Sequence, residues 1–178
     1  IVQANLADRA QRATLIERAS EPFGPLTALI NNASVFVPDS VETLDEELWD
    51  THFAVHTEAP VFLARDFVAQ LPDAVQGNII NIIDARLSRL SPSYTSYTLS
   101  KSALWTLTQT LALALAPKVR VNGVGPGPTI KNVRQSEDDF ARQWSETPLR
   151  RSIMPDEIAD AVRFIIHAPS MTGQMIAL

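Results

Sequence analysis

Three short apolar runs along the chain each end in polar or turn-forming residues. The first covers residues 26–30 and leads into NNAS, the second is GNIINIID, and the third is VRVNGVGPGPT. Helical patterns separate these runs, and strands that alternate with helices indicate a parallel sheet covered on both faces. Because ligands bind at the carboxyl ends of strands in such sheets, we expect the polar strand ends to converge on one crevice.

Strand and helix patterns alternate along the whole chain, and no internal repeat is present. The sequence predicts strands that begin at Ile1, Ala28, Asn78, Arg120 and Gln174. It predicts helices over residues 10–20, 45–70, 96–116, 138–144 and 155–167. We expect these elements to form a single domain over residues 1–178.

Composition agrees with one globular domain and excludes several classes of protein. The chain has 178 residues, a formal net charge of -5 and no Cys. Without Cys, a disulfide scaffold and thiol catalysis are excluded, and without a run of Lys and Arg, nucleic acid is not an expected partner. No apolar stretch is long enough to cross a bilayer, so we expect a cytoplasmic protein with no membrane partner. The crevice at the strand ends predicts a small-molecule substrate.

Tyr97 and Lys101 stand four residues apart at the start of a helical pattern. This spacing places a phenol and an ammonium group on one helix face. An unperturbed phenol titrates near pH ~10, so proton transfer near neutrality needs a neighbouring cation such as Lys101. By spacing alone, a solvated Tyr and a surface Lys are the alternative, and the polar strand ends nearby favour the chemical interpretation.

Together these segments resemble the short-chain dehydrogenase/reductase family along the whole chain. The matching segments are NNAS, YTLSK, VNGVGPG, TPLRRSIMPDEIADAVRFI and TGQMIAL. The resemblance implies a Rossmann-like, doubly wound parallel sheet and an oxidoreductase that uses NADPH, or alternatively NADH. It also implies that Tyr97 is the catalytic acid/base and that Lys101 is catalytic, holding the nicotinamide ribose and lowering the pKa of Tyr97.

The same resemblance assigns residues to the cofactor site. The residues it places against the dinucleotide are Asn5, Leu6, Asn31, Ala33, Ser34, Tyr97, Lys101, Pro126 and Gly127. Dinucleotide-binding folds begin with a strand and a Gly-rich turn that binds the pyrophosphate. This sequence starts at IVQANLAD and has neither. We therefore expect a domain that is incomplete at both ends and lacks the first strands of the sheet.

Asp84 stands thirteen residues before Tyr97, where the family has a Ser. A carboxylate beside a phenolate is unfavourable, so Asp84 should be partly protonated or neutralised by Lys101, by the oxidised nicotinamide or by a cationic substrate. Asp at this position resembles the pteridine reductase subgroup, as do Phe36, Tyr94 and Ser34. This resemblance implies reduction of a pterin-like or related conjugated substrate, with Asp84 catalytic and with Phe36, Asp84 and Tyr94 binding the substrate.

Other interpretations stay open for these residues. Asp84 can cap a local turn, and a buried aromatic residue such as Phe36 is ordinarily part of a core. At the level of function, one alternative is a general carbonyl or alcohol oxidoreductase of the same family. The other is a catalytically silent member that binds a ligand.

Two further positions bear on the site. His56 stands where most of the family has Asn, and we assign it no chemistry. His52 lies one helical turn earlier, but without Cys or a carboxylate at ligand spacing we expect no metal site. The polar segment 129–145 resembles a loop that folds over the substrate in the family, which implies that Trp144 or Phe140 closes the substrate pocket. An ordinary solvated loop is the alternative.

Apolar residues extend around much of the helix predicted over residues 96–116. They are Leu104, Trp105, Leu107, Leu111 and Leu115. One sheet face does not need so wide an apolar surface, so we expect a second subunit to cover part of it. The sequence therefore predicts a homo-oligomer, and the family resemblance implies a dimer or a tetramer.

Overall fold

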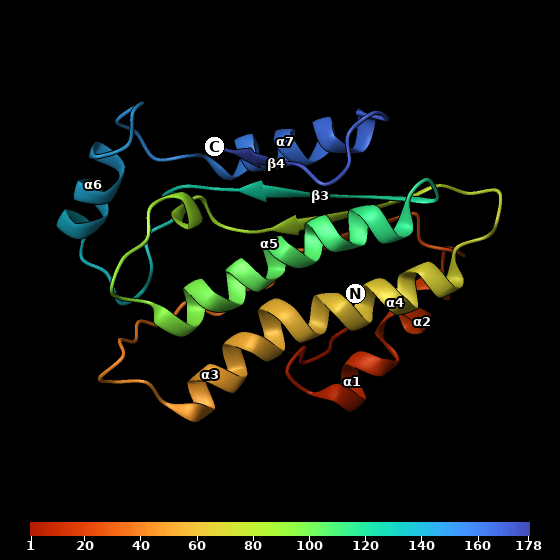
Figure 1. Ribbon diagram of the computed structural model, residues 1–178, viewed down its shortest axis with the longest axis horizontal. Coiled ribbons are helices and arrows are strands. Elements are labelled where there is room, and N and C mark those ends of the chain that lie inside the picture. The colour runs from red at the N-terminus through yellow and green to blue at the C-terminus, as the bar shows by residue number, and fades with distance from the viewer.

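The computed structural model describes residues 1–178 and contains a four-stranded parallel sheet (Figure 1). The strands lie in the order β1 (Ala28–Asn31), β2 (Gly77–Ile82), β3 (Val119–Gly125) and β4 (Met175–Ala177). In the ladders, Ile79 of β2 lies opposite Leu29 on one side and Val121 on the other. The predicted parallel α/β sheet is confirmed.

Helices cover both faces of this sheet, as Figure 1 shows. One face carries α1 (Arg9–Ala13), α2 (Leu15–Ser20), α3 (Glu46–Phe53), the π-helical turn η1 (Ala54–Glu58), α4 (Ala59–Gln70) and α5 (Thr95–Leu115). The other face carries α7 (Pro155–His167), and α6 (Glu137–Ser145) lies beyond the carboxyl ends of the strands. The doubly wound arrangement is thus confirmed. None of these helices is both long and apolar enough to span a membrane.

Three predicted elements differ from the structure. Residues 1–5 are not a strand, because no neighbouring strand offers them a hydrogen-bonded ladder. The helix predicted over residues 10–20 is divided at Thr14 into α1 and α2. The helix predicted over residues 45–70 is interrupted by η1, where the hydrogen bonds span one residue more than in an α-helix.

The main core lies between the sheet and the helices of the first face. Phe67 on α4 is fully buried in a cluster with Ile79 and Val121. A Cβ atom placed on Gly77 would come within 3.0 Å of Phe67 Cε1, so the ring packs directly against the start of β2. This apolar burial stabilises β2 against α4 and thereby fixes the strand whose end carries Asp84.

Some of the leucines predicted to form a wide surface on α5 belong to this core. Leu104 is buried, and Leu111 and Leu115 pack against the core cluster. Leu99 and Leu113 remain exposed, with 46% and 85% of their surface accessible. The apolar surface left free on α5 is therefore smaller than the sequence indicates.

The carboxyl ends of β2 and β3 stay together beyond the regular ladder. The Ile83 N–H donates to Val124 O at 2.7 Å, and the Ala85 N–H donates to Pro126 O at 3.1 Å. Asp84 lies between these two backbone bonds, and the 3₁₀ turn η2 (Ala85–Ser88) follows it. The predicted convergence of polar strand ends is observed for these two strands.

Candidate active site

Tyr97 and Asp84 form a direct hydrogen bond at the carboxyl end of the sheet. The Tyr97 hydroxyl donates to Asp84 Oδ2 at 2.7 Å, and Tyr97 is only 5% exposed. Helix α5 places the phenol, and the end of β2 places the carboxylate. The other carboxylate oxygen, Oδ1, accepts the Arg86 N–H at 2.7 Å, so Asp84 caps a turn and also binds the phenol.

The phenol of Tyr97 holds its proton in this arrangement. Burial raises its pKa, and the negative charge and hydrogen bond of Asp84 raise it further. Arg86 and Ser34 act in the opposite direction but do not reverse the shift. The expectation from the sequence is that Lys101 lowers the pKa of Tyr97. In the structure the pKa is raised instead, because burial has the largest effect.

Lys101 is buried beside this pair. Its Nζ donates to the Ile82 carbonyl at 2.8 Å and lies 5.9 Å from the centroid of the Tyr97 ring. Burial lowers the pKa of Lys101 to about 8, while the negative charge of Asp84 raises it. The ammonium group is therefore mostly charged at neutral pH and partly balances the Asp84 carboxylate.

An aromatic wall, formed by Phe36 and Tyr94, stands next to Tyr97. The two rings are stacked, with centroids 4.4 Å apart and planes 3° from parallel, and Phe36 meets the Tyr97 ring edge-on at 4.8 Å. Tyr94 has a left-handed backbone, with φ of 68°, which is unfavourable for a bulky residue. Its N–H donates to Asp39 O at 2.7 Å, which helps to hold this conformation.

His56 connects the segment after β1 to helix α5. Its Nε2 accepts the Val35 N–H at 3.1 Å and lies 3.0 Å from Ser34 Oγ. Because Nε2 is an acceptor, the ring proton is on Nδ1, which faces Ser100 Oγ at 2.9 Å. His56 is thus a neutral, buried link that positions residues next to Tyr97 and Phe36.

His52 makes a parallel connection one helical turn earlier. Its Nδ1 lies 2.6 Å from Ser96 Oγ, and Ser96 donates a very short hydrogen bond to Asp39. His52 is buried, and its Nε2 has no hydrogen-bond partner. The contacts His52–Ser96 and His56–Ser100 are called the two rungs here. They join α3 and η1, which carry the His residues, to the start of α5, which carries the Ser residues.

The neutral state of His56 predicts a loss of stability in acid. Burial, Lys101 and His52 lower the pKa of His56 to about 3, whereas an unfolded His titrates near pH ~6.5. Between these values the unfolded chain binds the extra proton, so folding stability falls as pH decreases through this window, by roughly 3 kcal/mol at pH 4. Urea unfolding from pH 7 to pH 4 should therefore show a smaller decline for His56→Asn than for the wild type.

The matched control for this experiment is His167→Asn, because His167 is exposed at the end of α7. This control should keep the acid slope of the wild type. The burial of His52 lowers its pKa too, so His56→Asn should retain part of the slope. An unchanged slope in His56→Asn would contradict the assignment of a buried neutral imidazole.

The residues assigned to the cofactor are only partly brought together. Leu6, Asn31 and Ala33 line one cavity of about 210 Å³, to which His56 also contributes. Asn31 is held by its side-chain N–H donating to Asn81 at 2.8 Å. Asn5 does not line this cavity, because its side chain accepts the Ala7 N–H within a local turn.

The loop after β3 is fixed close to the end of β4. Gly127 N–H donates to Leu178 O at 3.1 Å, and a Cβ atom on Gly127 would lie 3.2 Å from both that oxygen and Ile153 Cδ1. Glycine at this position therefore permits a close approach of the backbone. Pro126 lies beside Asp84, since its carbonyl accepts the Ala85 N–H.

Trp144 lies half-buried on α6 and makes no aromatic contact with Phe36 or Tyr94. Segment 129–145 reaches the wall through another residue, because the Asn132 side-chain N–H donates to the Phe36 carbonyl at 3.3 Å. The structure thus brings Phe36, Asp84, Tyr94 and Tyr97 together but does not bring Trp144 into that cluster.

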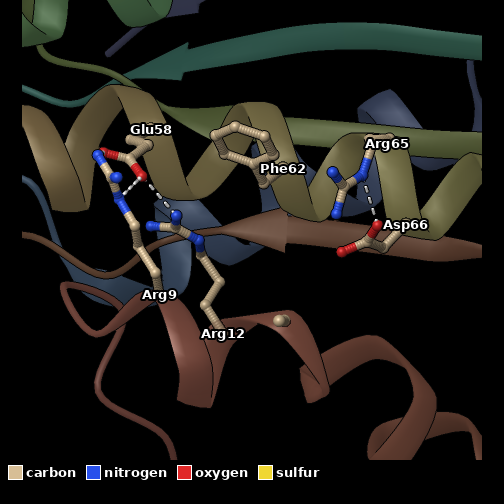
Figure 2. A pocket seen from close by; sticks show the side chains of 7 residues that line it. Arg9, Arg12, Glu58, Phe62, Arg65 and Asp66 are labelled. Atoms are coloured by element: carbon tan, nitrogen blue, oxygen red, sulfur yellow. Dashed lines mark hydrogen bonds and ion pairs between the residues drawn. The ribbon is translucent and has the colours of Figure 1, made fainter.

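A larger cavity of about 320 Å³ lies elsewhere, between α1 and α4 (Figure 2). Figure 2 shows Phe62 between two guanidinium groups, whose Cζ atoms lie 5.3 Å (Arg12) and 5.0 Å (Arg65) from the ring centroid. Arg12 pairs with Glu58 at 2.6 Å, and Arg65 pairs with Asp66 at 2.7 Å. Since its charges pair with one another, we interpret this cavity as a structural ion-pair cluster.

Sequence reasoning missed the contacts of His52, His56, Ser96, Asp39 and Arg86. One signal for the rungs was present, because HxxxH and SxxxS both have the spacing of one helical turn. Their partners lie 44 residues away, so only the packing of the two helices reveals the pairing. Asp39 and Arg86 had no such signal.

Comparisons with known proteins agree along the whole chain. A family model described as enoyl-(acyl carrier protein) reductase matches residues 1–178. An uncharacterized oxidoreductase of Methylorubrum extorquens is 33% identical over 98% of this chain and 73% of its own length. The 3-oxoacyl-(acyl-carrier-protein) reductase FabG of Thermotoga maritima is 28% identical over the same shares of the two chains.

A solved structure is more similar than these two relatives. The crystal structure of FolM alternative dihydrofolate reductase 1 from Brucella suis, in complex with NADP, is 50% identical with a TM-score of 0.95. The match covers 99% of this chain and 71% of that chain.

Proposed function

Because this chain belongs to the short-chain dehydrogenase/reductase family, we propose that it reduces a pterin-like or related conjugated heterocycle with NADPH. The observation that carries this proposal is the hydrogen bond of 2.7 Å between the Tyr97 hydroxyl and Asp84. It pairs a proton donor with a carboxylate in a partly buried site at the carboxyl end of the sheet.

In the proposed reaction, Tyr97 delivers the proton. The raised pKa keeps the phenol protonated at neutral pH, so it approaches the substrate as an acid. Asp84 accepts N–H groups of the heterocycle and holds the ring nitrogen close to the phenol. A carboxylate in this position favours a substrate with several N–H groups over a plain ketone, which offers no donor.

The aromatic wall supports a flat substrate. The rings of Phe36 and Tyr94 are already stacked at 4.4 Å, which leaves no room for a third ring between them. We therefore propose that the heterocycle binds on the free side of this wall, with Phe36 against it and Tyr94 behind. Trp144 is proposed to close the far side of the pocket when segment 129–145 covers the substrate.

The residues present fit a nicotinamide dinucleotide. Lys101 Nζ is buried and uses one acceptor, the Ile82 carbonyl, so two of its three N–H donors are available for ribose hydroxyls. We propose that the remaining parts of the dinucleotide are held by Leu6, Asn31, Ala33, Ser34 and the loop at Pro126 and Gly127, with Asn5 nearby. When bound, the reduced cofactor supplies a hydride to the C=N or C=O bond of the substrate.

Relatives support the proposal at different levels. The Brucella suis protein is described as an alternative dihydrofolate reductase with NADP, which supports both a pterin substrate and NADPH for this chain. The exposed Leu99 and Leu113 support association into a homo-oligomer, although less strongly than the sequence suggested. A single domain over residues 1–178 is also our proposal.

One observation favours a second candidate function. The FabG relative and the family description both refer to reductases of acyl-carrier substrates, which favours a general carbonyl reductase in which Asp84 is tolerated. The two candidates differ in what the Asp84 carboxylate does, so substitutions at this residue separate them.

The test measures NADPH oxidation by the full-length protein with dihydrobiopterin, dihydrofolate and a panel of simple ketones. For Asp84→Ser, we expect kcat/KM for the dihydropterins to fall about 10²-fold or more, because the group that orients the ring nitrogen is removed. Asp84→Asn is the isosteric companion variant, since it keeps the size of the side chain while it removes the charge and replaces one acceptor oxygen with an N–H donor.

The outcomes separate the candidates. Pterin-selective turnover that both variants lose supports the carboxylate role. Turnover of ketones alone, kept or improved in Asp84→Ser, assigns the protein to the general carbonyl reductases. No oxidation with any substrate favours a silent, ligand-binding member.

A further inference from the structure

Arg86 lies against the aromatic wall of the proposed active site. It belongs to η2, two residues after Asp84, and its Cζ lies 5.2 Å from the ring centroids of both Phe36 and Tyr94. Its backbone N–H donates to Asp84 Oδ1 at 2.7 Å. The turn that orients the carboxylate therefore also places a guanidinium group beside the substrate pocket.

The guanidinium group of Arg86 has neither a hydrogen bond nor an ion pair in the structure. Only two other Arg residues are as sheltered from solvent, Arg12 and Arg120. Arg12 binds Glu58 and a backbone carbonyl, and Arg120 binds three backbone carbonyls. Arg86 is half-buried, and none of its guanidinium nitrogens is fully buried, so its five N–H donors are free to bind an acceptor that comes from outside.

The side chain of Arg86 makes no ion pair or hydrogen bond with Asp84 or Tyr97. Asp84 accepts the Tyr97 hydroxyl and a backbone N–H, and its carboxylate does not pair with the Arg86 side chain. The positive charge of Arg86 does lower the pKa of Tyr97, against the larger effects of burial and Asp84. Arg86 is therefore close enough to influence the reacting groups while its donors stay free.

We infer that Arg86 binds a carboxylate on an arm that extends from the heterocyclic ring of the substrate. This inference rests on the proposed function, because it requires a pterin-like ring beside Asp84 and Tyr97. The ring N–H groups are donors and suit Asp84, whereas the cationic Arg86 has only donors to offer. Its planar fork fits a carboxylate with two parallel hydrogen bonds, while one face stays against the wall.

The test compares two substrates that share the dihydropterin ring and differ in the arm. Dihydrofolate carries carboxylates on its arm, and dihydrobiopterin has a neutral arm. For Arg86→Gln in the full-length protein with NADPH, we expect the KM for dihydrofolate to rise about tenfold or more relative to the KM for dihydrobiopterin, with any change in kcat shared by the two substrates. Arg86→Lys should restore part of the loss, because it keeps the charge without the fork.

Arg89→Gln is the matched control. Arg89 is in the same loop but 77% exposed, and it pairs with Glu146 at 3.6 Å. Removing this charge should leave the KM for both substrates unchanged. If Arg86→Gln raises both KM values equally, Arg86 only supports the aromatic wall, and the inference is overturned. It is also overturned if neither KM changes.

A binding measurement separates this inference from the proposed function. Calorimetry with p-aminobenzoylglutamate, the arm without the pterin ring, reports anion binding without turnover. We expect millimolar binding by the wild type that is lost in Arg86→Gln. If neither dihydropterin is reduced, the proposed function fails, but binding of p-aminobenzoylglutamate that is lost in Arg86→Gln still supports the anion site. If p-aminobenzoylglutamate does not bind the wild type, the inference about Arg86 is overturned.

Discussion

Replacing Tyr97 with Phe is expected to lower kcat about 10²–10⁴-fold, the range typical of losing a positioned acid. The substitution removes only the hydroxyl that donates to Asp84 at 2.7 Å. The buried ring keeps its edge contacts with Phe36 and His56, at 4.8 and 5.3 Å between centroids, so the fold should be retained. Steady-state NADPH oxidation, together with thermal unfolding of the same samples, measures both effects.

Tyr94→Phe provides the comparison, since these are the only two Tyr residues of the chain. Its hydroxyl makes no hydrogen bond to Asp84, and its ring centroid lies 6.4 Å from that of Tyr97. We expect a loss of no more than severalfold in kcat. Wild-type turnover in Tyr97→Phe would exclude the phenol as the proton donor and with it the proposed mechanism.

Replacing Phe67 with Ala is expected to reduce the free energy of unfolding by about 3–5 kcal/mol. The ring is fully buried between α4 and the start of β2, where it lies against Gly77. Its removal leaves a cavity that the neighbouring Leu71 and Ile79 fill only in part. Urea unfolding followed by circular dichroism measures the loss as a lower midpoint at constant slope.

Phe23→Ala is the corresponding surface change. Phe23 is 88% exposed in the turn after α2, so its removal should change the free energy of unfolding by about 0.5 kcal/mol or less. Similar effects of the two substitutions would contradict the assignment of the core to the α4–β2 layer.

Local patterns predicted the elements that local chemistry determines. Helix α7 begins at Pro155 and ends at His167 as predicted, because Pro and the acidic residues after it favour a helix start. Helix α5 begins within one residue of its predicted position. Asp84 and Tyr97 were expected to be neighbours from their positions at a strand end and a helix start, and the structure places them in contact.

Features that depend on distant partners were not predictable in this way. The apolar sequence at residues 1–5 favours a strand, but strand formation depends on a partner that the pattern cannot identify. Asn5 satisfies its polar groups in a local turn, an outcome that competes with any ligand contact. The orientation of the Arg86 side chain toward the wall depends on how η2 is folded, and nothing in ARLS specifies it.

The two His–Ser rungs join residues separated by the same interval of 44 positions. Sliding one helix past the other by a single turn would bring His56 opposite Ser96 and satisfy one rung again. The two alignments differ in what surrounds each rung, because Asp39 binds Ser96, whereas Val35 binds His56. Segment 35–39 therefore selects one alignment of the two helices. Because this segment also carries Phe36, the same contacts that align the helices also position the aromatic wall.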